Sequence, residues 1–588
     1  MRERVVLELS LTIRSPFLFQ GLDGALGIDA AALRDEQGRP VIPAEQVKGV
    51  LRAALDVLAK HAPDVATAAE IETLFGRESS STDKGSGAGA SDEPNRARIF
   101  FRDLVAEGLS APSITTRVEI DDETGAAKTG ALQMIELAAP FGAEVAFVGR
   151  MILQERDEAK ARRVVHALGL AAELVPAIGA LKSSGFGEVV ARKISVVPDA
   201  PKTPASLAGP VERIDYRVSF DGPILVDARR EAENLFVGSD IVPGAVFKGA
   251  LATKLAVQGL NPETDPDWSA ALSALHVSHA FPESEDGRAT GLPIPFSALT
   301  WRVGQDWAVA DALLAGGGVV SPEGEVAAHV LDWKGAAWDA FHRRTNWPVD
   351  FDPPSPLLRS HVKIERDSLV AADQQLFTTV AKSVWRRGED RWLPRAWRLS
   401  VDFGKVPEAF RDRLRAAIEA GLEPIGKTQA SATFEIAGTS VPVAAPIPGR
   451  PGLHAVTLAT PALLLDPCSQ VPVAEQYRAV IKQQTGGELL RFFALRNLAG
   501  GYVSMRRRPY GRTYYPFVLT KAGSVFLIEG ADSARLQEIA RFGFQPVALQ
   551  GADTLDWRTC PYLPENGYGQ AAFNLVDHAA LGAELGHV

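Results

Sequence analysis

The sequence predicts an α+β protein built from repeated strand–helix–strand modules. One segment recurs at an offset of 200 residues, each copy follows a stretch of alternating apolar and polar residues, and a Pro-rich segment separates the copies. A chain of 588 residues is also too long for one ordinary hydrophobic core, so we expect two to four domains.

The repeated segment reads as the start of a helix. Val41-Ile42-Pro43 is followed, after a short spacer, by Val47-Lys48-Gly49, and Ile241-Val242-Pro243 is followed at the same spacing by Phe247-Lys248-Gly249. Proline is favoured at the opening of a helix because its φ is already set and its missing N–H is not needed there. Small and apolar residues continue each copy, which predicts a packed helix.

The stretches before the two helices read as strands. Residues 5–13 and 214–220 alternate apolar and polar side chains, and a proline follows each stretch. Such alternation is typical of a half-buried strand. Residues 454–461 repeat the pattern a third time without the Pro and Lys-Gly element. The order of elements predicts tandem ferredoxin-like (RRM-like) α+β domains with insertions. A duplicated scaffold without a shared activity is the alternative.

Low-complexity segments mark the expected domain boundaries. The Pro-rich stretch 198–210 reads as a linker between a first domain, 1–200, and a second domain, 211–443. A further Pro/Gly stretch, 444–451, precedes residues 452–588, which we expect to be the C-terminal part of the second module or a third ferredoxin-like half. Residues 79–94 read as a Ser/Gly-rich loop inside the first domain.

Composition narrows the function classes. No apolar run approaches the ~20 residues of a membrane span, and the N-terminal residues do not read as a signal peptide. The two cysteines cannot form a disulfide framework or a zinc cluster, so we expect a cytoplasmic protein with no membrane partner. The net charge of −10 does not favour nucleic-acid binding, but a binding footprint is a local patch and not a total.

The first 200 residues carry an ordered set of short motifs. They are Gly27-Ile28-Asp29, Leu33-Arg34-Asp35, the Pro43 element, Leu74-Phe75-Gly76, a strand over 99–103, an excursion over 115–136, and Ser183-Ser184-Gly185-Phe186-Gly187. This set resembles the RAMP superfamily, which builds CRISPR RNA-bound effector complexes, and specifically the backbone subunit of type III complexes that cuts target RNA. The resemblance implies that residues at about 113–139 form the thumb-like insertion of that subunit.

The second part of the chain resembles another RAMP branch, the handle-binding subunit of type III-D-like systems. The matching segments are Ile241-Val242-Pro243-Gly244 with Lys248-Gly249, residues 276–282, 292–295, 361–366 and 375–377, and residues 521–526. The first module departs from the family pattern at Ala44-Glu45, where a glycine and a small hydroxyl residue are preferred. The resemblance therefore implies a cutting module fused to a handle-binding module.

Asp29 is the candidate catalytic and metal-binding residue. It lies in a loop of glycine and small residues between the first strand and the Pro43 helix. An exposed carboxylate can hold a divalent metal or bias a ribose 2′-hydroxyl toward attack on its own phosphate. The resemblance places the cleaving aspartate of the family here and implies Mg²⁺ or another divalent cation as cofactor. Asp23 and Asp35 are rivals in the same region, and a plain Asx-turn is the structural alternative.

Basic and glycine residues supply the candidate RNA contacts. Lys48 and Lys248 open their helices, where N–H groups and an ammonium suit phosphate oxygens, and Arg52 shares the face of Lys48. A glycine loop lets backbone approach a phosphate, and arginines mixed with tyrosines suit single-stranded RNA. A solvated helix face, a hairpin turn and an acid-paired arginine cluster are the respective alternatives. The complete set is Lys48, Arg52, Lys182, Gly185, Gly187, Lys248, Arg506, Arg507, Arg508 and Arg512.

Three functions follow as hypotheses. In the first, the chain binds guide CRISPR RNA and cleaves complementary single-stranded target RNA in its first domain. The resemblance then implies other effector subunits as partners, including a large polymerase-like subunit and further RAMP subunits. In the second, the chain is a non-catalytic scaffold for the guide. In the third, it is a CRISPR RNA-processing endoribonuclease, which is disfavoured because no histidine lies in a candidate RNA-facing loop of the first domain.

Overall fold

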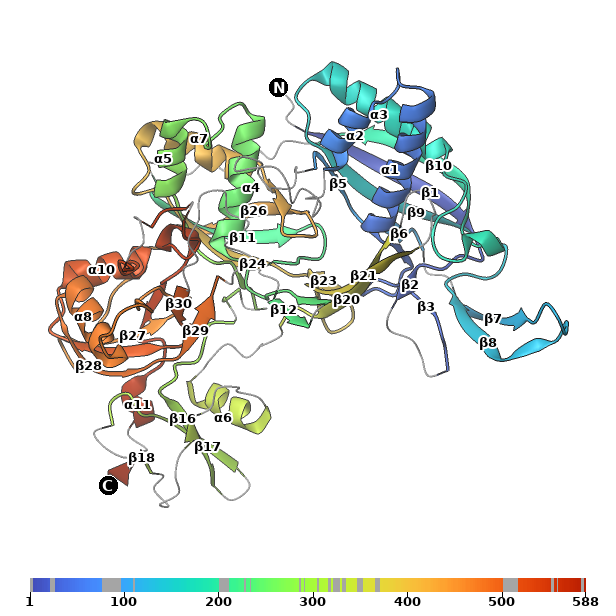
Figure 1. The fold of residues 1–588 in the computed structure, drawn as a ribbon. Helices are drawn as coiled ribbons and strands as arrows, with labels where there is room; N and C mark the ends of the chain where they lie inside the picture. The colour runs from blue at the N-terminus through green and yellow to red at the C-terminus, as the bar shows by residue number, and fades with distance from the viewer. Residues whose placement is uncertain are drawn as a thin grey trace.

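The structure is a computed structural model, and three of its antiparallel sheets carry most of the chain (Figure 1). We call the parts built around these sheets the first, second and third units. The structure describes residues 4–587 except for 22–26, 77–96, 109–110, 200–210, 227–228, 233, 285–286, 290, 304–305, 316–318, 321–327, 330–334, 346–352, 365–370, 501–516, 551–554, 558 and 583–585.

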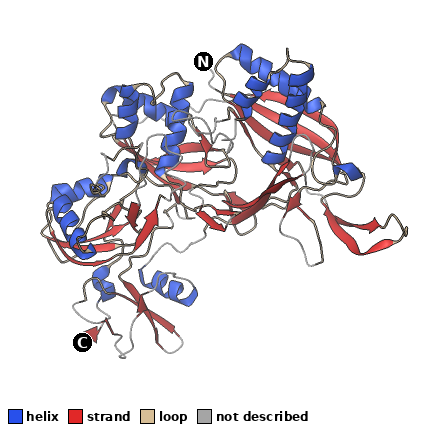
Figure 2. Ribbon diagram, in the orientation of Figure 1, coloured by secondary structure: helices blue, strands red, loops and turns tan. Residues whose placement is uncertain are grey.

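The helices of the first unit lie on one face of its sheet (Figure 2). Its sheet runs in the order β10–β1–β9–β6–β4, and every pairing is antiparallel. Strand–helix–strand–strand–helix–strand with the fourth strand beside the first is the ferredoxin-like arrangement. The elements are β1 (Val5–Arg14), β4 (Val41–Ile42), α1 (Ala44–His61), α2 (Ala68–Phe75), β5 (Ile99–Phe101), β6 (Leu104–Ala106), β9 (Glu144–Leu153), α3 (Glu158–Glu173) and β10 (Glu188–Val197).

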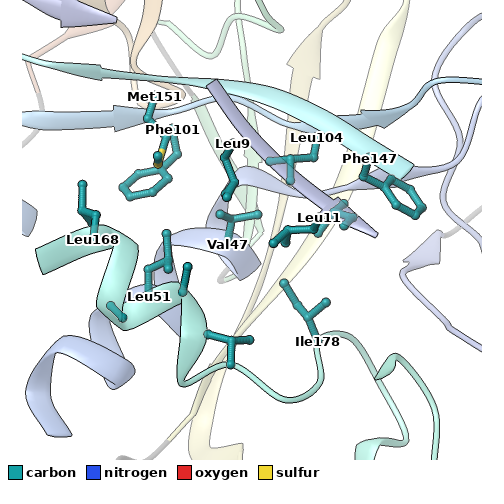
Figure 3. Packing of buried hydrophobic residues seen from close by; sticks show 14 of the residues in the cluster. Leu9, Leu11, Val47, Leu51, Phe101, Leu104, Phe147, Met151, Leu168 and Ile178 are labelled. Carbon is teal, nitrogen blue, oxygen red and sulfur yellow. The ribbon is translucent and has the colours of Figure 1, made fainter. Parts of the chain in front are cut away.

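The core of the first unit follows from the two periodicities of its sequence. Alternate residues of β1 point to the helices, and Figure 3 shows Leu9 and Leu11 lying over Val47 and Leu51 of α1. All four side chains are at most 4 % exposed. Burying one such side chain stabilises the fold by roughly 1.5–3 kcal/mol, so this strand–helix contact anchors the unit.

The second and third units repeat the same strand order. The second sheet runs β14–β24–β11–β26–β25 with β15 also on β24, and the third runs β28–β31–β27–β32. The second unit comprises β11 (Arg213–Phe220), α4 (Gly244–Val257), α5 (Pro266–Ala274), β14 (His276–Val277), β15 (Phe281–Pro282), β24 (Trp397–Asp402), α7 (Glu408–Glu419), β25 (Leu422–Ile425) and β26 (Ala430–Gly438). The third comprises β27 (Leu453–Leu458), α8 (Val473–Thr485), β28 (Glu488–Phe493), β31 (Val525–Glu529), α10 (Ser533–Phe542) and β32 (Ala571–Phe573).

Each unit has its largest insertion at the same point, between its second and third core strands. In the first unit this is the hairpin of β7 (Ser113–Ile120) and β8 (Ala127–Leu137), which projects away from the body (Figure 1). The third unit has β29 (Arg496–Ala499) and β30 (Phe517–Thr520). The second has β16 (Ala298–Val303), β17 (Asp306–Asp311), β18 (Val319–Val320), β19 (Ala328–His329), α6 (Gly335–Thr345), β20 (Pro356–Ile364), β21 (Ala371–Lys382), β22 (Trp385–Arg387) and β23 (Trp392–Pro394).

Short elements complete the chain. β20 and β21 form a sheet with β12 (Arg229–Ala232) and β13 (Leu235–Val237) that reaches toward the first unit (Figure 1). The remaining elements are β2 (Gln20–Gly21), β3 (Ala31–Ala32), the 3-10 turns η1 (Lys182–Ser184) and η2 (Pro564–Asn566), α11 (His578–Gly582) and β33 (Gly586–His587). None of the helices in the described ranges is long and apolar enough to cross a membrane.

Charged side chains join the units. Arg102 of the first unit donates to Asp221 (2.6 Å) and Ser431 (2.7 Å) of the second. Arg541 of α10 donates to both carboxylate oxygens of Asp402, at 2.6 and 2.9 Å, across the joint of the second and third units. The predicted α+β class with tandem ferredoxin-like domains is confirmed. The expected linker at 198–210 lies almost wholly outside the described residues, and the assignment of RAMP types to the segments stays a prediction.

Candidate functional site

Asp29 lies at the base of the projecting hairpin. Its backbone N–H donates to the carbonyl of Met134 in β8 (2.9 Å), and its carboxylate Oδ2 accepts the N–H of the same residue (2.6 Å). Ala30 continues the contact as a bridge to Ile135. The exposed Asp29 side chain is therefore held in place by a strand more than 100 residues away in sequence.

A small apolar cluster brings three predicted segments together. It contains Leu18 and Ala30 from the chain around Asp29, Ile135 and Leu137 from β8, and Phe186 from the glycine loop. All five side chains are at most 7 % exposed. Because buried apolar contacts are close-packed, this cluster fixes the Asp29 loop, the hairpin base and the glycine loop relative to one another. We call it the apolar seat.

The glycine loop presents Lys182 and Gly185 to solvent beside this seat. Gly185 has φ +81°, and a Cβ added there would meet nothing within 4 Å. Gly187 differs, because a Cβ there would lie 1.9 Å from the carbonyl oxygen of Ile178. Its glycine is needed for close approach to the chain's own backbone, which accounts for the motif without an RNA phosphate. Arg117 of β7 donates to the Ser184 hydroxyl at 3.0 Å, a second link between hairpin and loop.

The rival carboxylates are not equivalent to Asp29. Asp35 accepts hydrogen bonds from the backbone N–H groups of Gln37 (3.0 Å) and Arg39 (2.8 Å), and it pairs with the Arg39 guanidinium at 2.7 Å. This is a turn-stabilising role, the structural alternative considered for Asp29. Asp23 lies outside the described residues.

The start of α1 is already occupied by a carboxylate. The N–H of Ala44 donates to Asp103 Oδ1 (2.9 Å), and Arg359 of β20 donates to both Asp103 oxygens, at 3.0 and 2.5 Å. Burial alone would raise the pKa of Asp103, but the charge and hydrogen bonds of Arg359 outweigh burial and hold the pKa below its ordinary value. The helix end that was expected to attract phosphate therefore carries an internal anion.

Lys48 and Arg52 lie half-buried on α1, beyond this capped end. The Arg52 guanidinium lies 6.0 Å from the centroid of the Phe75 ring in α2. Both side chains remain candidates for RNA contact along the helix, whereas the N–H groups of its first turn do not provide an open phosphate site.

Lys248 was expected to contact RNA phosphate at the start of α4, but the structure buries it there. Its side chain is 8 % exposed, and its Nζ lies 3.4 Å from the carbonyl oxygen of Glu565 in η2. Burial lowers the Lys248 pKa to about 8. A Cβ on Gly244 would lie 2.0 Å from the carbonyl oxygen of Val277, so this helix start is packed against its neighbours. Lys248 thus lies in the interface between the second and third units, where RNA does not reach it in this arrangement.

Other predicted residues divide between buried and undescribed positions. His276 and His279 are buried, with 6 % and 5 % of their surface exposed. The tract with Arg506, Arg507, Arg508 and Arg512 lies between β29 and β30 in sequence and outside the described residues.

Sequence reasoning missed Glu136, which accepts hydrogen bonds from Arg34 and from the backbone of Ala32. The charges of Arg34 and Glu136 are 102 positions apart, so no local motif connects them.

The residues around Asp29 offer a cation one carboxylate. Among the described residues, no three His, Cys, Asp or Glu side chains gather as a metal-binding group. Mg²⁺ is commonly held by one or two carboxylates together with substrate phosphates and water, so this donor set fits a cation shared with RNA and not an all-protein cage.

Comparison with known proteins identifies the first unit. Residues 10–190 match the family model of the RAMP superfamily. A chain in a solved structure, described as the type III-B Cmr-beta complex bound to cognate target RNA, is similar at 17% identity and a TM-score of 0.23. The match covers 33% of this chain and 61% of that chain, and so weak a likeness supports no argument about function. A search of curated proteins finds no match.

The first unit combines a ferredoxin-like strand order with a projecting hairpin. The match over residues 10–190 confirms the resemblance at the level of the RAMP superfamily, and the assignment to a target-cutting backbone subunit stays a prediction.

Proposed function

We propose that this chain is a subunit of a type III CRISPR RNA-guided effector complex that binds guide RNA and cleaves complementary target RNA with its first domain. One observation carries the proposal: within the RAMP domain, the apolar seat gathers the Asp29 loop, the hairpin and the glycine loop at one place. Such an enzyme needs its substrate positioned against a reactive group more than it needs a large set of catalytic side chains.

The chain's own residues would act on RNA in simple ways. The exposed Asp29 carboxylate would accept a hydrogen bond from the ribose 2′-hydroxyl next to the scissile phosphate and bias it toward attack. The exposed Lys182 ammonium and the Gly185 backbone would bind phosphate oxygens beside the seat. The hydrogen bond from Met134 N–H to Asp29 Oδ2 holds the carboxylate in one position at the base of the hairpin.

A divalent cation such as Mg²⁺ would neutralise developing charge on the phosphate when bound. Asp29 would be its protein ligand, and RNA oxygens and water would complete its coordination. The partners under this proposal are the guide CRISPR RNA, single-stranded target RNA, a large polymerase-like subunit and further RAMP subunits. The second and third units would bind the 5′ handle of the guide, with the arginine tract 506–512 as a candidate contact.

The experiment is target-RNA cleavage by the assembled complex carrying Asp29→Ala or Asp29→Asn. Asparagine keeps an oxygen that can accept the Met134 N–H but removes the charge, so the two variants separate chemistry from loop structure. We expect both variants to lose cleavage at the site assigned to this subunit while guide binding persists. Asp64→Ala, an exposed carboxylate after α1, is the control that leaves cleavage unchanged. Unchanged cleavage by Asp29→Ala refutes the catalytic proposal.

A non-catalytic scaffold is the second candidate function. It is favoured because, among the described residues, no three His, Cys, Asp or Glu side chains gather as a metal-binding group. The same assay decides between the two, because a scaffold would leave cleavage to another subunit, and Asp29→Ala would then not change the cleavage rate.

A further inference from the structure

Glu136, near the end of β8, contacts the chain around Asp29 through three hydrogen bonds. Its Oε1 accepts from Arg34 Nη2 at 2.8 Å, its Oε2 accepts from the Ala32 N–H at 3.1 Å, and its own N–H donates to the Ala30 carbonyl at 2.9 Å. The Glu136 and Arg34 side chains are 22% and 23% exposed, so the ion pair is partly shielded from solvent.

Arg34 extends this contact along the loop. Its Nη1 donates to the carbonyl of Gly38 at 3.0 Å, and its backbone forms a bridge with Pro40. Residues 29–34 are thereby held on β8 at both ends of a short segment: at Met134 through Asp29, and at Glu136 through Arg34. Both attachment points lie on the hairpin, two residues apart.

The hairpin beyond these points is exposed. Ile114, Val118, Ile120 and Leu132 are 46–63% exposed, and the hairpin projects away from the rest of the first unit (Figure 1). Beyond Met134 and Glu136, Arg117 of the hairpin donates an exposed hydrogen bond to the Ser184 hydroxyl of the domain. Met134 and Glu136 are therefore the points through which the base of the hairpin holds the Asp29 loop.

We infer that Arg34 and Glu136 are positioning residues that hold Asp29 on the hairpin, so that the hairpin's orientation sets where the Asp29 carboxylate stands against target RNA. The inference rests on the proposed function and adds to it the side chains that align the reactive group. A displacement of about 1 Å at a reacting group can cost on the order of 100-fold in rate, so loosening this ion pair should slow the chemical step.

The test is single-turnover cleavage by the assembled full-length complex, measured over a range of target concentrations. Glu136→Gln should lower the rate at saturating target about 10-fold or more while the half-saturating target concentration changes by less than about 2-fold. The reversed pair Arg34→Glu with Glu136→Arg should recover part of the lost rate, which neither single reversal does. Glu119→Gln, which breaks the exposed hairpin ion pair with Lys128 (2.8 Å) away from Asp29, is the matched control and should cut at the wild-type rate.

A second measurement keeps the inference testable if Glu136→Gln assembles poorly. Arg34→Lys keeps the charge but loses the forked donor geometry, and it should slow cleavage while amide hydrogen exchange accelerates at residues 29–32. Wild-type rates in Glu136→Gln, or a loss confined to target affinity, would overturn the inference while leaving the proposed function intact. Unchanged cleavage in Asp29→Ala would instead remove the proposed function itself.

Discussion

Two buried histidines lie where the second unit meets the third. The His276 ring lies 4.7 Å from the Phe542 ring of α10, and the His279 ring lies 4.7 Å from the Tyr568 ring. Burial lowers the pKa of each histidine to about 3, from an ordinary value of 6.5, and nearby Lys405 and Lys248 add to the effect at His276. Both rings therefore stay neutral in the folded protein at a pH where they would be protonated in the unfolded chain.

Because the histidine pKa values differ between the folded and the unfolded chain, the free energy of unfolding depends on pH. A histidine with a lowered pKa contributes its full stability above pH 6.5, and that stability is lost as the pH falls, because the unfolded chain binds a proton that the folded chain does not. One pH unit below the ordinary pKa, the cost is about 1.4 kcal/mol per histidine, or roughly 3 kcal/mol for the two. These two histidines should therefore lower the free energy of unfolding by about that amount between pH 7.5 and pH 5.5.

The assay is urea unfolding of the full chain at pH 7.5 and 5.5, for the wild type and for the double variant His276→Asn, His279→Asn. The variant should lose about 3 kcal/mol less than the wild type over this pH change. Burial also lowers the pKa values of His361 and His454, which contribute equally to both proteins, so the difference between them isolates the pair. His166→Asn, at an exposed position of α3, should behave as the wild type. Equal losses in wild type and double variant would refute the reasoning.

Three further predictions concern the first unit and its interface with the second. Arg359→Ala should lower the free energy of unfolding of the full chain in urea by about 2–4 kcal/mol, because it leaves the mostly buried Asp103 carboxylate without its cation. The same free energy of unfolding in Arg359→Ala and the wild type would contradict this prediction. Gly187→Ala should lower the melting temperature far more than Gly185→Ala, because only the Gly187 Cβ would collide with the Ile178 carbonyl oxygen. The cost of Gly185→Ala, about 1–2 kcal/mol, comes from its positive φ alone. Equal shifts in melting temperature would contradict the argument that Gly187 is needed for close backbone approach. Lys182→Ala should weaken guide-RNA binding and reduce the slope of log affinity against log salt by about 1, and an unaltered slope in filter binding would exclude a phosphate contact there.

Local sequence patterns were sufficient for the elements and their repetition. Alternation along residues 5–13 and 214–220 reports which face of a strand is buried, and Pro43 and Pro243 mark where helices begin. For the third unit, the sequence predicts the strand at 454–461 but not the helix after it, because the Pro and Lys-Gly element is missing there. The sheet of this unit nevertheless has the same strand order as the other two. That order depends on which strands pair, a long-range property that propensity does not record.

The candidate site divides in the same way. The loop position and exposure of Asp29 could be expected from its neighbours in sequence, as could the excursion that forms β7 and β8. The attachment of Asp29 to Met134 could not, because a backbone hydrogen bond to a strand 105 residues away leaves no residue signature. The same holds for the Arg34–Glu136 pair, since isolated charges of opposite sign occur throughout any soluble chain.

By itself, the sequence determined the α+β class, the repeated Pro-led helices and the family of the first domain. Tertiary structure alone decided what covers the helix starts. Asp103 and Arg359 close the start of α1, and η2, 317 positions along the chain from Lys248, closes the start of α4. A Lys-Gly motif at a helix end has the same local chemistry whether phosphate or protein lies beyond it. Only the packing of the units shows which of the two is there, because burial is a property of the whole fold.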